Sequence, residues 1–593
     1  GGAPANEHVG HVGCDASGGT RFHGAIGAVI ARDGATDAAG IAKLAAERPD
    51  VTTPIGELAG TTGLVGRGGL TLAAWVKPDE LPAGGQRILD KITVGASDGF
   101  LFDAWPGAGL RCIVGATTVT VPDVLRAGEW QHVAAVVDAG GGVTFYRNGQ
   151  RLGQPATSAV VPEGSDAEVV SRAYLLQRYV QTCAGRGRYP IKFNGSLFTV
   201  PSPGSPGDAD YRRWGPGYWW QNTRLPYYSM CAAGDFEQME PLFRMYARDL
   251  MPLAAYRTKV NLGHGGAYIP ECIYFWGDMF TETYGWQPAA ERKDKLQASG
   301  WHKYEWVSGL ELCWLLLDKY SYTGDTETLA LLLPTARQIL TFFDQHYAVD
   351  AQGKLNMTPS QAVETWWDCT NPMPELAGLH AVTERLLALG ERLPTADREF
   401  VTKLAAKLPP LPTRDTPDGP ALAPAARFAN KSNIENPELY AVFPFRLCSF
   451  DQDNHALGEQ ALAHRWDRGD AGWRQDSLFA AYLGQAEETR RSLVRRARSK
   501  HAASRFPAFW GPNYDWIPDQ DHGSVLLATL QAMLMQVDGE RIWLLPAWPR
   551  EWDCEFRLHA PGQTTLTGRV RAGRVEGLVV TPKSRAKDVV VAE

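Results

Sequence analysis

The sequence predicts a multidomain protein: an antiparallel β-sandwich, then a toroid of paired helices, then a small C-terminal β-sheet domain. Three observations carry this prediction. The chain has 593 residues, which is more than one hydrophobic core usually organises. Apolar residues alternate with period two near both ends of the chain, and between these ends they follow helical spacing. The changes of pattern place the domains at residues 1–163, 164–537 and 538–593.

Residues 1–163 are rich in Gly, Val, Thr and Ala, and they alternate between apolar and polar side chains. The runs 70–78, 110–122 and 130–152 are typical of strands that Gly turns connect. Within the last run, the sequence YRNGQ contains the Asn-Gly pair of a two-residue β-hairpin turn. Together these strands predict an antiparallel sandwich.

This zone resembles the laminin G-like, concanavalin A-like jelly-roll sandwich. LTLAAWVKP, EWQHVAAVVD and VTFYRNGQRLG follow one another in the order of that family's central strands. The resemblance implies further strands after Gly153, where this chain soon turns helical, and RFHGAIGAV near the N-terminus looks like the missing hairpin. An unclosed sandwich would expose a long apolar edge. We therefore favour residues 8–33 completing the sandwich of residues 60–160; the alternative is a truncated copy of a preceding domain.

Between residues 165 and 537, apolar residues recur at helical spacing, as in GLELCWLLLDKYSYTG and TLALLLPTARQILTFFDQHY. Many of these segments are paired through short loops, and long loops rich in Trp, Pro, Asp and Asn separate them. About a dozen helices in hairpins predict a toroid of inner and outer helices. Residues 538–593 return to strand alternation, as in TTLTGRVRAGRVEGLVVTP.

Bulk composition excludes several functions. A net charge of -7 without any Lys/Arg run argues against nucleic-acid binding. No apolar run is long enough to span a membrane. The nine cysteines are scattered without metal-ligand spacing, so we expect no metal site among them and mostly buried free thiols.

The tryptophan content is unusually high: the chain has 20 tryptophans, and eight of them lie in the segment from Trp214 to Trp314. Core packing is one explanation. Their clustering beside Asn, Gln, Arg and Glu favours the other, a sugar-binding cleft whose rings stack on pyranose faces. In residues 217–228, GYWWQNTRLPYY, we expect an inner helix whose polar side chains face the cavity and whose rings form its walls.

Hydrolysis of a glycosidic bond requires two carboxyl groups, one to donate a proton and one to activate water or attack directly. Acids embedded in aromatic loops between predicted helices are the candidates, because burial raises the pKa of a proton donor. Such acids are Glu271, Asp278, Glu364, Glu435, Asp515 and Asp521. Asp521 precedes a predicted helix, where capping is the alternative role.

The helical zone resembles the six-hairpin glycosidases with an (α/α)6 barrel, and its order of segments is most similar to glycoside hydrolase family 95. NIENPELYAVFPF, RWDRGDAGWRQDSLFAAYLGQAEET and PDQDHGSVLLATLQAMLMQVDGERIWLLPAWPREW carry the resemblance, together with QNTRLPYY. It covers about residues 165–593 and is strongest in the last third.

The resemblance implies catalytic roles. TPSQAVETWW is the counterpart of the family's Ser-Pro-Glu motif and makes Glu364 the proton donor; Asp521 in DQDHG matches the carboxylate that assists the attacking water. Asn222 matches one of two Asn residues that hold this water, but Trp220 stands where the other is expected, so the fucosidase specificity of the family does not carry over. Glu271 is then a substitute acid or base. The resemblance implies inversion, with carboxyl groups about 6.5–9.5 Å apart.

Further residues are expected to bind substrate. They are Trp219, Trp220, Gln221, Asn222, Arg224, Asp278, Trp366, Trp367, Glu435, Trp510, Asp515 and His522. Two of them keep alternatives open: Arg224 either pairs with a carboxylate or binds sugar hydroxyls or an anionic group, and His522 either caps a helix or orients Asp521.

The leading interpretation is an exo-acting, inverting glycoside hydrolase of oligo- or polysaccharides, secreted or periplasmic, with a carbohydrate as its partner. It needs no cofactor; a structural Ca²⁺ in the sandwich is the one ion considered. The alternatives are a polysaccharide lyase, with QNTRLPYY and His264 supplying a base and a cation, and a non-catalytic glycan-binding protein.

Overall fold

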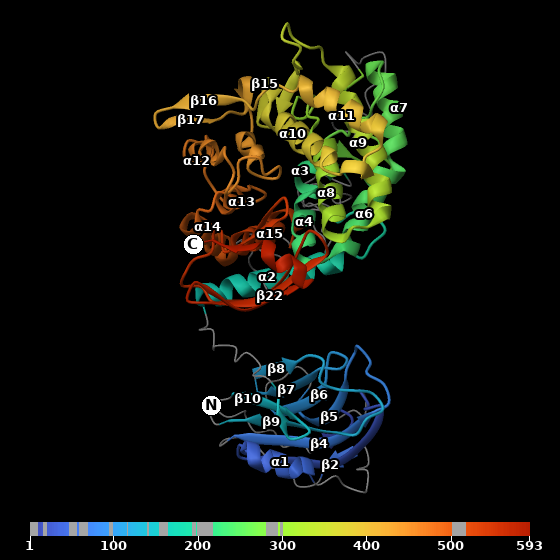
Figure 1. The fold of residues 1–593 in the computed structure, drawn as a ribbon, viewed down its shortest axis with the longest axis vertical. Helices are drawn as coiled ribbons and strands as arrows, with labels where there is room; N and C mark the ends of the chain where they lie inside the picture. Colours follow the sequence, from blue (N-terminus) through green and yellow to red (C-terminus); the bar gives the residue numbers. More distant parts are fainter. Residues whose placement is uncertain are drawn as a thin grey trace, which may run out of the picture. The chain divides into compact units, whose positions relative to one another are not determined.

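The computed structural model describes residues 10–15, 20–46, 56–58, 69–93, 99–115, 117–138, 142–152, 164–192, 197, 217–279, 295–296, 300–500 and 518–592. The chain divides into two compact units, Gly1–Val161 and Pro162–Glu593 (Figure 1). The second unit thus contains both the helical zone and the C-terminal strands.

The N-terminal unit is built from two antiparallel sheets with the orders β3-β1-β5-β6-β7-β8 and β11-β10-β9-β4-β2. The strands are β1 (Gly10–Val12), β2 (Gly24–Asp33), β3 (Gly56–Leu58), β4 (Leu70–Pro78), β5 (Gln86–Lys91), β6 (Phe100–Ala104), β7 (Leu110–Val114), β8 (Thr117–Val121), β9 (Gln131–Val137), β10 (Val143–Arg147) and β11 (Gln150–Arg151). One helix, α1 (Ala38–Ala46), accompanies them.

The core of this unit lies between the two sheets. Leu70, Leu72 and Ala74 of β4 enter it, while Ala73 lies on the other face of the strand and packs with Ile41 of α1. Successive side chains of a strand point to opposite faces, so the covering helix explains why both faces of β4 are buried.

The two N-terminal strands belong to opposite sheets of this sandwich. β2 pairs with β4, with Ala31 opposite Leu72, and β1 pairs with β5, with Val12 opposite Leu89. Both strands therefore pair with residues of the 60–160 segment instead of with each other. The predicted Asn-Gly turn joins β10 to β11 with positive φ at both turn residues, as a type I′ hairpin requires.

The helices of the second unit occur mostly in antiparallel pairs (Figure 1). They are α2 (Asp166–Ala184), α3 (Trp220–Thr223), α4 (Leu225–Tyr228), α5 (Met230–Ala233), α6 (Glu240–Phe243), α7 (Met251–Leu262), α8 (Val307–Thr323), α9 (Thr326–His346), α10 (Met373–Leu387), α11 (Thr395–Lys407), α12 (His455–Ala463), α13 (Asp476–Tyr482), α14 (Ala486–Arg498) and α15 (Gln520–Leu534). Shorter turns are η1 (Phe236–Met239), η2 (Arg244–Asp249), η5 (Gly390–Arg392), η6 (Pro437–Ala441) and η8 (Lys583–Asp588).

Contacts run from helix to helix around this unit. α8 packs on α9 and α10, and α10 packs on α11 and on η6. α13 packs on α14 and α15, and α15 packs on α2 and on α4. One large hydrophobic cluster extends through most of these helices. The helical pattern read from the sequence is therefore present, with a shared core.

The strands of the second unit form small sheets with the orders β12-β13, β14-β15-β18, β16-β17, β19-β20-β24 and β21-β22-β23. They are β12 (Tyr218–Trp219), β13 (Cys272–Ile273), β14 (Ser360–Ala362), β15 (Trp366–Pro372), β16 (Thr413–Thr416), β17 (Gly419–Leu422), β18 (Ala425–Lys431), β19 (Met535–Asp538), β20 (Arg541–Leu544), β21 (Cys554–Ala560), β22 (Thr564–Arg571), β23 (Arg574–Thr581) and β24 (Val589–Val591). The last six strands share one hydrophobic cluster with α2, α14 and α15.

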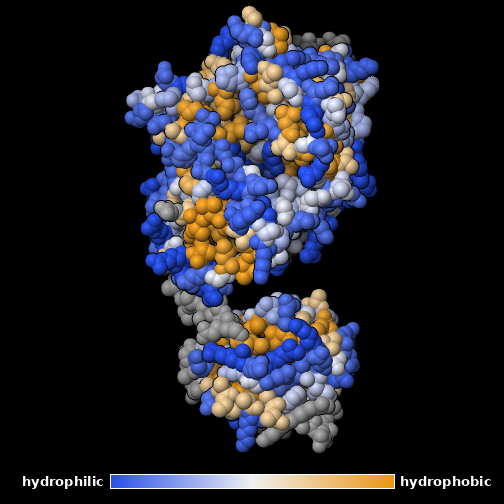
Figure 2. All heavy atoms as spheres, in the orientation of Figure 1, coloured by the Kyte–Doolittle hydropathy of each residue, from blue (hydrophilic) through white to orange (hydrophobic). Residues whose placement is uncertain are grey.

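The visible face of each unit is mostly hydrophilic, with hydrophobic residues in separate groups (Figure 2). Among the described residues, no helix has the length and apolar character that a membrane span requires. All nine cysteines are free thiols, and seven of them are buried.

Candidate active site

The short helix α3 begins against the loop that carries Glu271. β12 pairs with β13, which places Trp219 opposite Cys272. The main-chain N–H of Trp220 donates to the main-chain O of Glu271 at 2.7 Å, and the N–H of Gln221 donates to its carboxylate Oε1 at 2.6 Å. Glu271 is thereby fixed at the N-terminal end of α3.

The side chains of α3 donate hydrogen bonds to three further carboxylates. The donors are Trp220 Nε1 to Glu311 Oε2 (2.7 Å), Asn222 Nδ2 to Asp521 Oδ2 (2.7 Å) and Gln221 Nε2 to Glu435 Oε2. These acids come from α8, from α15 and from the loop before η6. One helical turn thus collects acids that are distant in the sequence.

Arg224 follows this turn and is almost completely buried. Its guanidinium pairs with Glu311 and Glu435 and donates to Tyr440 Oη at 2.6 Å. Burial alone would lower the pKa of Arg224, but Glu311 and other negative neighbours raise it well above its usual value. Of the two roles left open by the sequence, the structure shows the ion pair; contact of Arg224 with a sugar stays a prediction.

Glu364 occupies the tip of the hairpin between β14 and β15. Its carboxylate accepts a hydrogen bond from Asn433 Nδ2 at 2.8 Å. Burial first, and the charge of Glu435 second, raise the pKa of Glu364 to about 7, against the lowering effect of Asn433. The residue keeps part of its surface exposed. Glu364 is therefore a half-buried residue whose carboxyl has a pKa near neutral.

Two more glutamates share the electrostatic field of Glu364. Burial raises the pKa of Glu271 well above its usual value, and the charge of Glu364 raises it further. Burial also raises the pKa of Glu305, with Glu271 and Glu364 as its leading charged neighbours. The charges of Glu364 at the hairpin tip, Glu271 beside the start of α3 and Glu305 before α8 therefore influence one another.

Asp521 is fully buried in the first turn of α15. The N-cap of this helix is Asp519, whose side chain accepts from the main-chain N–H of His522 at 3.3 Å. His522 lies between the two acids, with Nδ1 3.2 Å from Asp519 and Nε2 3.6 Å from Asp521. His522 thus lies at ion-pair distance from both acids, and its role in orienting Asp521 stays a prediction.

The same three residues are the candidate metal ligands within the described part of the chain. One ligand atom from each of Asp519, Asp521 and His522 lies within 4.8 Å of the others. Carboxylate and imidazole donors at this spacing suit a divalent cation. The capping of α15 and the hydrogen bond from Asn222 account for the same arrangement without an ion.

The predicted aromatic residues lie around the β14–β15 hairpin and α3. Trp366 is buried against Phe428 and Trp466, whereas Trp367 is half-buried and meets Trp301 edge to face. Trp219 is half-buried. Trp220 is fully buried against Tyr246, so its ring is part of the core.

Three predicted residues are not brought to this cluster by described contacts. Asp278 lies on an exposed turn, where its carboxylate accepts from the N–H of Met279. Trp510 and Asp515 lie outside the described residues. Their roles stay predictions.

Sequence reasoning missed three buried acids of this region: Glu305, Glu311 and Glu375. Glu375 accepts from the main-chain N–H of Trp306 at 3.0 Å, and burial raises its pKa to about 8. Each lies beside the start of an apolar helix, in YEWVSGLEL or PMPELAGL. A Glu flanked by apolar residues at the start of a predicted helix is the sequence signal that could have identified them.

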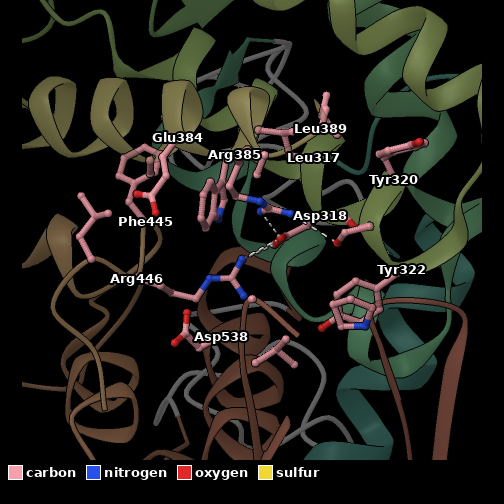
Figure 3. A pocket seen from close by; sticks show the side chains of 18 of the residues that line it. Leu317, Asp318, Tyr320, Tyr322, Glu384, Arg385, Leu389, Phe445, Arg446 and Asp538 are labelled. Atoms are coloured by element: carbon pink, nitrogen blue, oxygen red, sulfur yellow. Dashed lines mark hydrogen bonds and ion pairs between the residues drawn. The ribbon is translucent and has the colours of Figure 1, made fainter. Parts of the chain in front are cut away.

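A separate cavity of about 390 Å³ lies at the C-terminal ends of α8 and α10 (Figure 3). Arg385 and Arg446 both donate to Asp318 there, at 2.6 and 2.7 Å, and both stack on Trp314. Glu311 and Asp318 stand seven residues apart on α8, about 10 Å along the helix axis. This cavity is therefore distinct from the acid cluster.

Comparison with known proteins agrees with the architecture of the first unit. A family model for the concanavalin A-like lectin/glucanases superfamily matches residues 55–180. The N-terminal unit contains a concanavalin A-like domain. No curated protein matches the chain.

Several solved structures are similar to the chain at low identity. A glycosidase, one variant of which was solved with glucose, is 15% identical with a TM-score of 0.38, over 62% of this chain and 99% of its own. A protein described as a kojibiose phosphorylase from human microbiome is 9% identical with a TM-score of 0.41, over 85% and 79%. A family 78 rhamnosidase of Bacillus sp. GL1 is 12% identical with a TM-score of 0.38, over 88% and 53%.

Proposed function

We propose that the protein is a glycoside hydrolase that inverts the anomeric centre and removes sugars from the end of oligo- or polysaccharides. The observation that carries the proposal is Glu364, whose pKa is raised to about 7 at a partly exposed hairpin tip. A general acid works best when its pKa is close to the working pH. Burial beside a second carboxylate is a known way to reach this state.

In the proposed reaction, Glu364 gives its proton to the oxygen of the leaving sugar while the bond from that oxygen to the anomeric carbon breaks. Water attacks the anomeric carbon from the opposite side and loses a proton to Asp521. Asn222 holds Asp521 through its amide, and the neighbouring Gln221 holds Glu271 and Glu435. Adjacent residues of α3 thereby hold Asp521 and two further acids of the same cluster. No cofactor is needed.

The proposal includes the scaffold. The inner segments would be α3–α5, α8, α10, η6, α13 and α15, each preceded by an outer helical segment in the chain. Contacts of α15 with α4, and of α10 with α8 and η6, support a closed (α/α)6 ring. The C-terminal strands would then be a small β-domain that packs on one side of it.

The contacts favour hydrolysis over the lyase alternative. Tyr227 is buried and Tyr228 is half-buried, and desolvation raises the pKa of both phenols far above their usual value, so neither is suited to be a base. His264 contacts Gly265 and His346. The two carboxyl groups of the proposed reaction, Glu364 and Asp521, also favour catalysis over a purely glycan-binding role.

A screen of aryl glycosides and of plant, algal and host oligosaccharides tests the proposal. We expect release of reducing sugar without a rise in ultraviolet absorbance, and loss of this release in Glu364→Gln. Glu399→Gln, an exposed glutamate on α11, is the matched control. Ultraviolet-absorbing unsaturated products, or full activity of Glu364→Gln, would contradict the proposal.

A further inference from the structure

Trp301 is a large apolar side chain kept at the surface beside the hairpin of Glu364. It is 45% exposed, and its ring meets that of Trp367 edge to face, with centroids 5.0 Å apart. An exposed aromatic residue on its own is common. The way in which this one is held in place, however, indicates a function.

A buried amide fixes the loop that carries Trp301. Gln361 of β14 is 1% exposed, and its Nε2 donates to the main-chain O of Gly300 at 2.8 Å and of Trp301 at 3.1 Å. Its Oε1 accepts from the N–H of Tyr304 at 2.6 Å. Burying a polar side chain is costly unless its hydrogen bonds are made, and here those bonds fix the position of an exposed indole.

Trp367 connects Trp301 to the acid. Its Nε1 donates to the main-chain O of Glu364 at 2.9 Å. A Cβ atom on Gly300 would lie 3.1 Å from the Trp367 ring, so the loop passes close to it. Trp367 and Trp301 therefore form an aromatic pair that is anchored to the main chain of the hairpin tip. A proton donor contacts the oxygen of the leaving group, so aromatic rings beside the donor are candidates to bind that group.

Trp466 provides the internal comparison. It is 41% exposed, but it packs on Trp366, which neighbours Trp367 in β15 and so points to the opposite side of the strand. Trp466 is therefore a similarly exposed indole on the other side of the same hairpin, with the guanidinium of Arg414 4.3 Å from its ring centroid.

We propose that Trp301 stacks on the leaving-group sugar, and that the natural substrates are glycosides whose leaving group is itself a pyranose. Flat aromatic side chains supply apolar area at little conformational cost. The inference rests on the proposed function and specifies its substrate class: oligosaccharides instead of aryl or alkyl glycosides.

Two substrates of one sugar test the inference: the disaccharide that the screen identifies, and the fluoride of its non-reducing sugar. Fluoride leaves no ring to stack on Trp301. We expect Trp301→Ala to lower kcat/KM for the disaccharide about tenfold, equal to ~1.4 kcal/mol, with the glycosyl fluoride unchanged. Trp301→Phe should restore most of the loss. Trp466→Ala should change neither substrate.

The outcomes separate the two proposals. Three outcomes would overturn the role of Trp301 but leave the proposed function intact. They are an equal loss on both substrates in Trp301→Ala, no loss on the disaccharide in that variant, or the same selective loss in Trp466→Ala. A wild-type protein that cleaves neither oligosaccharides nor glycosyl fluorides would overturn the proposed function, and this inference with it. Circular dichroism confirms that the variants are folded.

Discussion

The two ends of helix α8 place their acids in opposite surroundings: Glu311 is fully buried and Asp318 is half-buried. Near its N-terminus, Glu311 shares Arg224 with Glu435, and its pKa is raised, by burial first. Near its C-terminus, Asp318 is paired with both Arg385 and Arg446. Burial alone would raise the pKa of Asp318, but the two guanidinium groups hold it below its usual value.

The difference shows that the effect of the surroundings on the pKa of a carboxyl group depends on how many arginines pair with it. At one end carboxyl groups outnumber the arginine that pairs with them, so protons are retained and proton transfer becomes possible. At the other end two cations serve one acid, so the acid stays ionised and joins α8, α10 and the loop of Arg446. The first arrangement suits catalysis and the second suits stability.

The largest expected effect is at the acid-rich end. Glu364→Gln and Asp521→Asn should each lower kcat about 10²–10⁴-fold, because each removes a group that transfers a proton. Steady-state kinetics on the best substrate of the screen measures this. Asp318→Asn at the other end should leave kcat of the folded protein within about twofold. Normal turnover in either of the first two variants would remove that residue from the mechanism.

Stability should distinguish the two ends next. Arg224→Met leaves two buried carboxylates without their cation and should cost about 3–5 kcal/mol. Arg446→Met should cost less, about 1–2 kcal/mol, because Asp318 keeps Arg385. Urea denaturation followed by near-ultraviolet circular dichroism compares them. Glu311→Gln should recover part of the loss in Arg224→Met, and equal costs at both ends would contradict the comparison.

The pH dependence of stability should differ in sign between acids with raised and acids with lowered pKa values. The pKa of Glu375 is raised to about 8, so its contribution to stability is complete below the unfolded pKa of about 4.3 and is lost as pH rises to about 8. Glu375→Gln should therefore reduce the fall in stability between about pH 5 and pH 8 by about 3–4 kcal/mol.

Asp318 should show the opposite sign. Its lowered pKa gives stability that is present above the unfolded pKa and is lost as pH falls through the folded one. Urea midpoints across pH for wild type, Glu375→Gln and Asp318→Asn measure both signs. Parallel curves for wild type and Glu375→Gln would contradict the assignment, and Glu399→Gln controls for the loss of a surface charge.

Activity should follow the same logic at Glu364. With a pKa of about 7 in the free enzyme, kcat/KM should decline as pH rises above this value, because the proton donor becomes ionised. Asn433→Ala removes a hydrogen bond that lowers the pKa, so the alkaline limb should move to higher pH. If the alkaline limb of the kcat/KM profile does not move in Asn433→Ala, Glu364 is not the group whose ionisation causes it.

Sequence periodicity predicted the sandwich strands, but it did not show that both faces of β4 are buried, because α1 covers the face opposite the core. It also predicted the helices, and the Asn-Gly turn at residues 148–149 appears where expected. The placement of residues 8–33 was only partly predictable. Their strands pair with the 60–160 segment, but no local pattern shows that β1 and β2 lie in opposite sheets.

The candidate site shows the same division. The sequence predicted which residue types and loops form the site, and in the structure Gln221, Asn222 and Arg224 contact acids. The sequence could not predict which acid each of them contacts, because Asn222 and its partner Asp521 are 299 residues apart in the chain. Trp220 was expected at a cavity wall, yet it is fully buried, because both ring faces of a tryptophan can be covered when its N–H finds an acceptor such as Glu311.

By itself, the sequence determined the elements and their chemistry: period two and helical spacing report local burial, and acids beside rings mark places where proton chemistry is possible. The tertiary structure alone decided which acids meet, which of them receive an arginine, and therefore which pKa values rise or fall. The physical reason is that desolvation and charge pairing depend on distances across the fold. A sequence lists the charges, but only packing sets those distances.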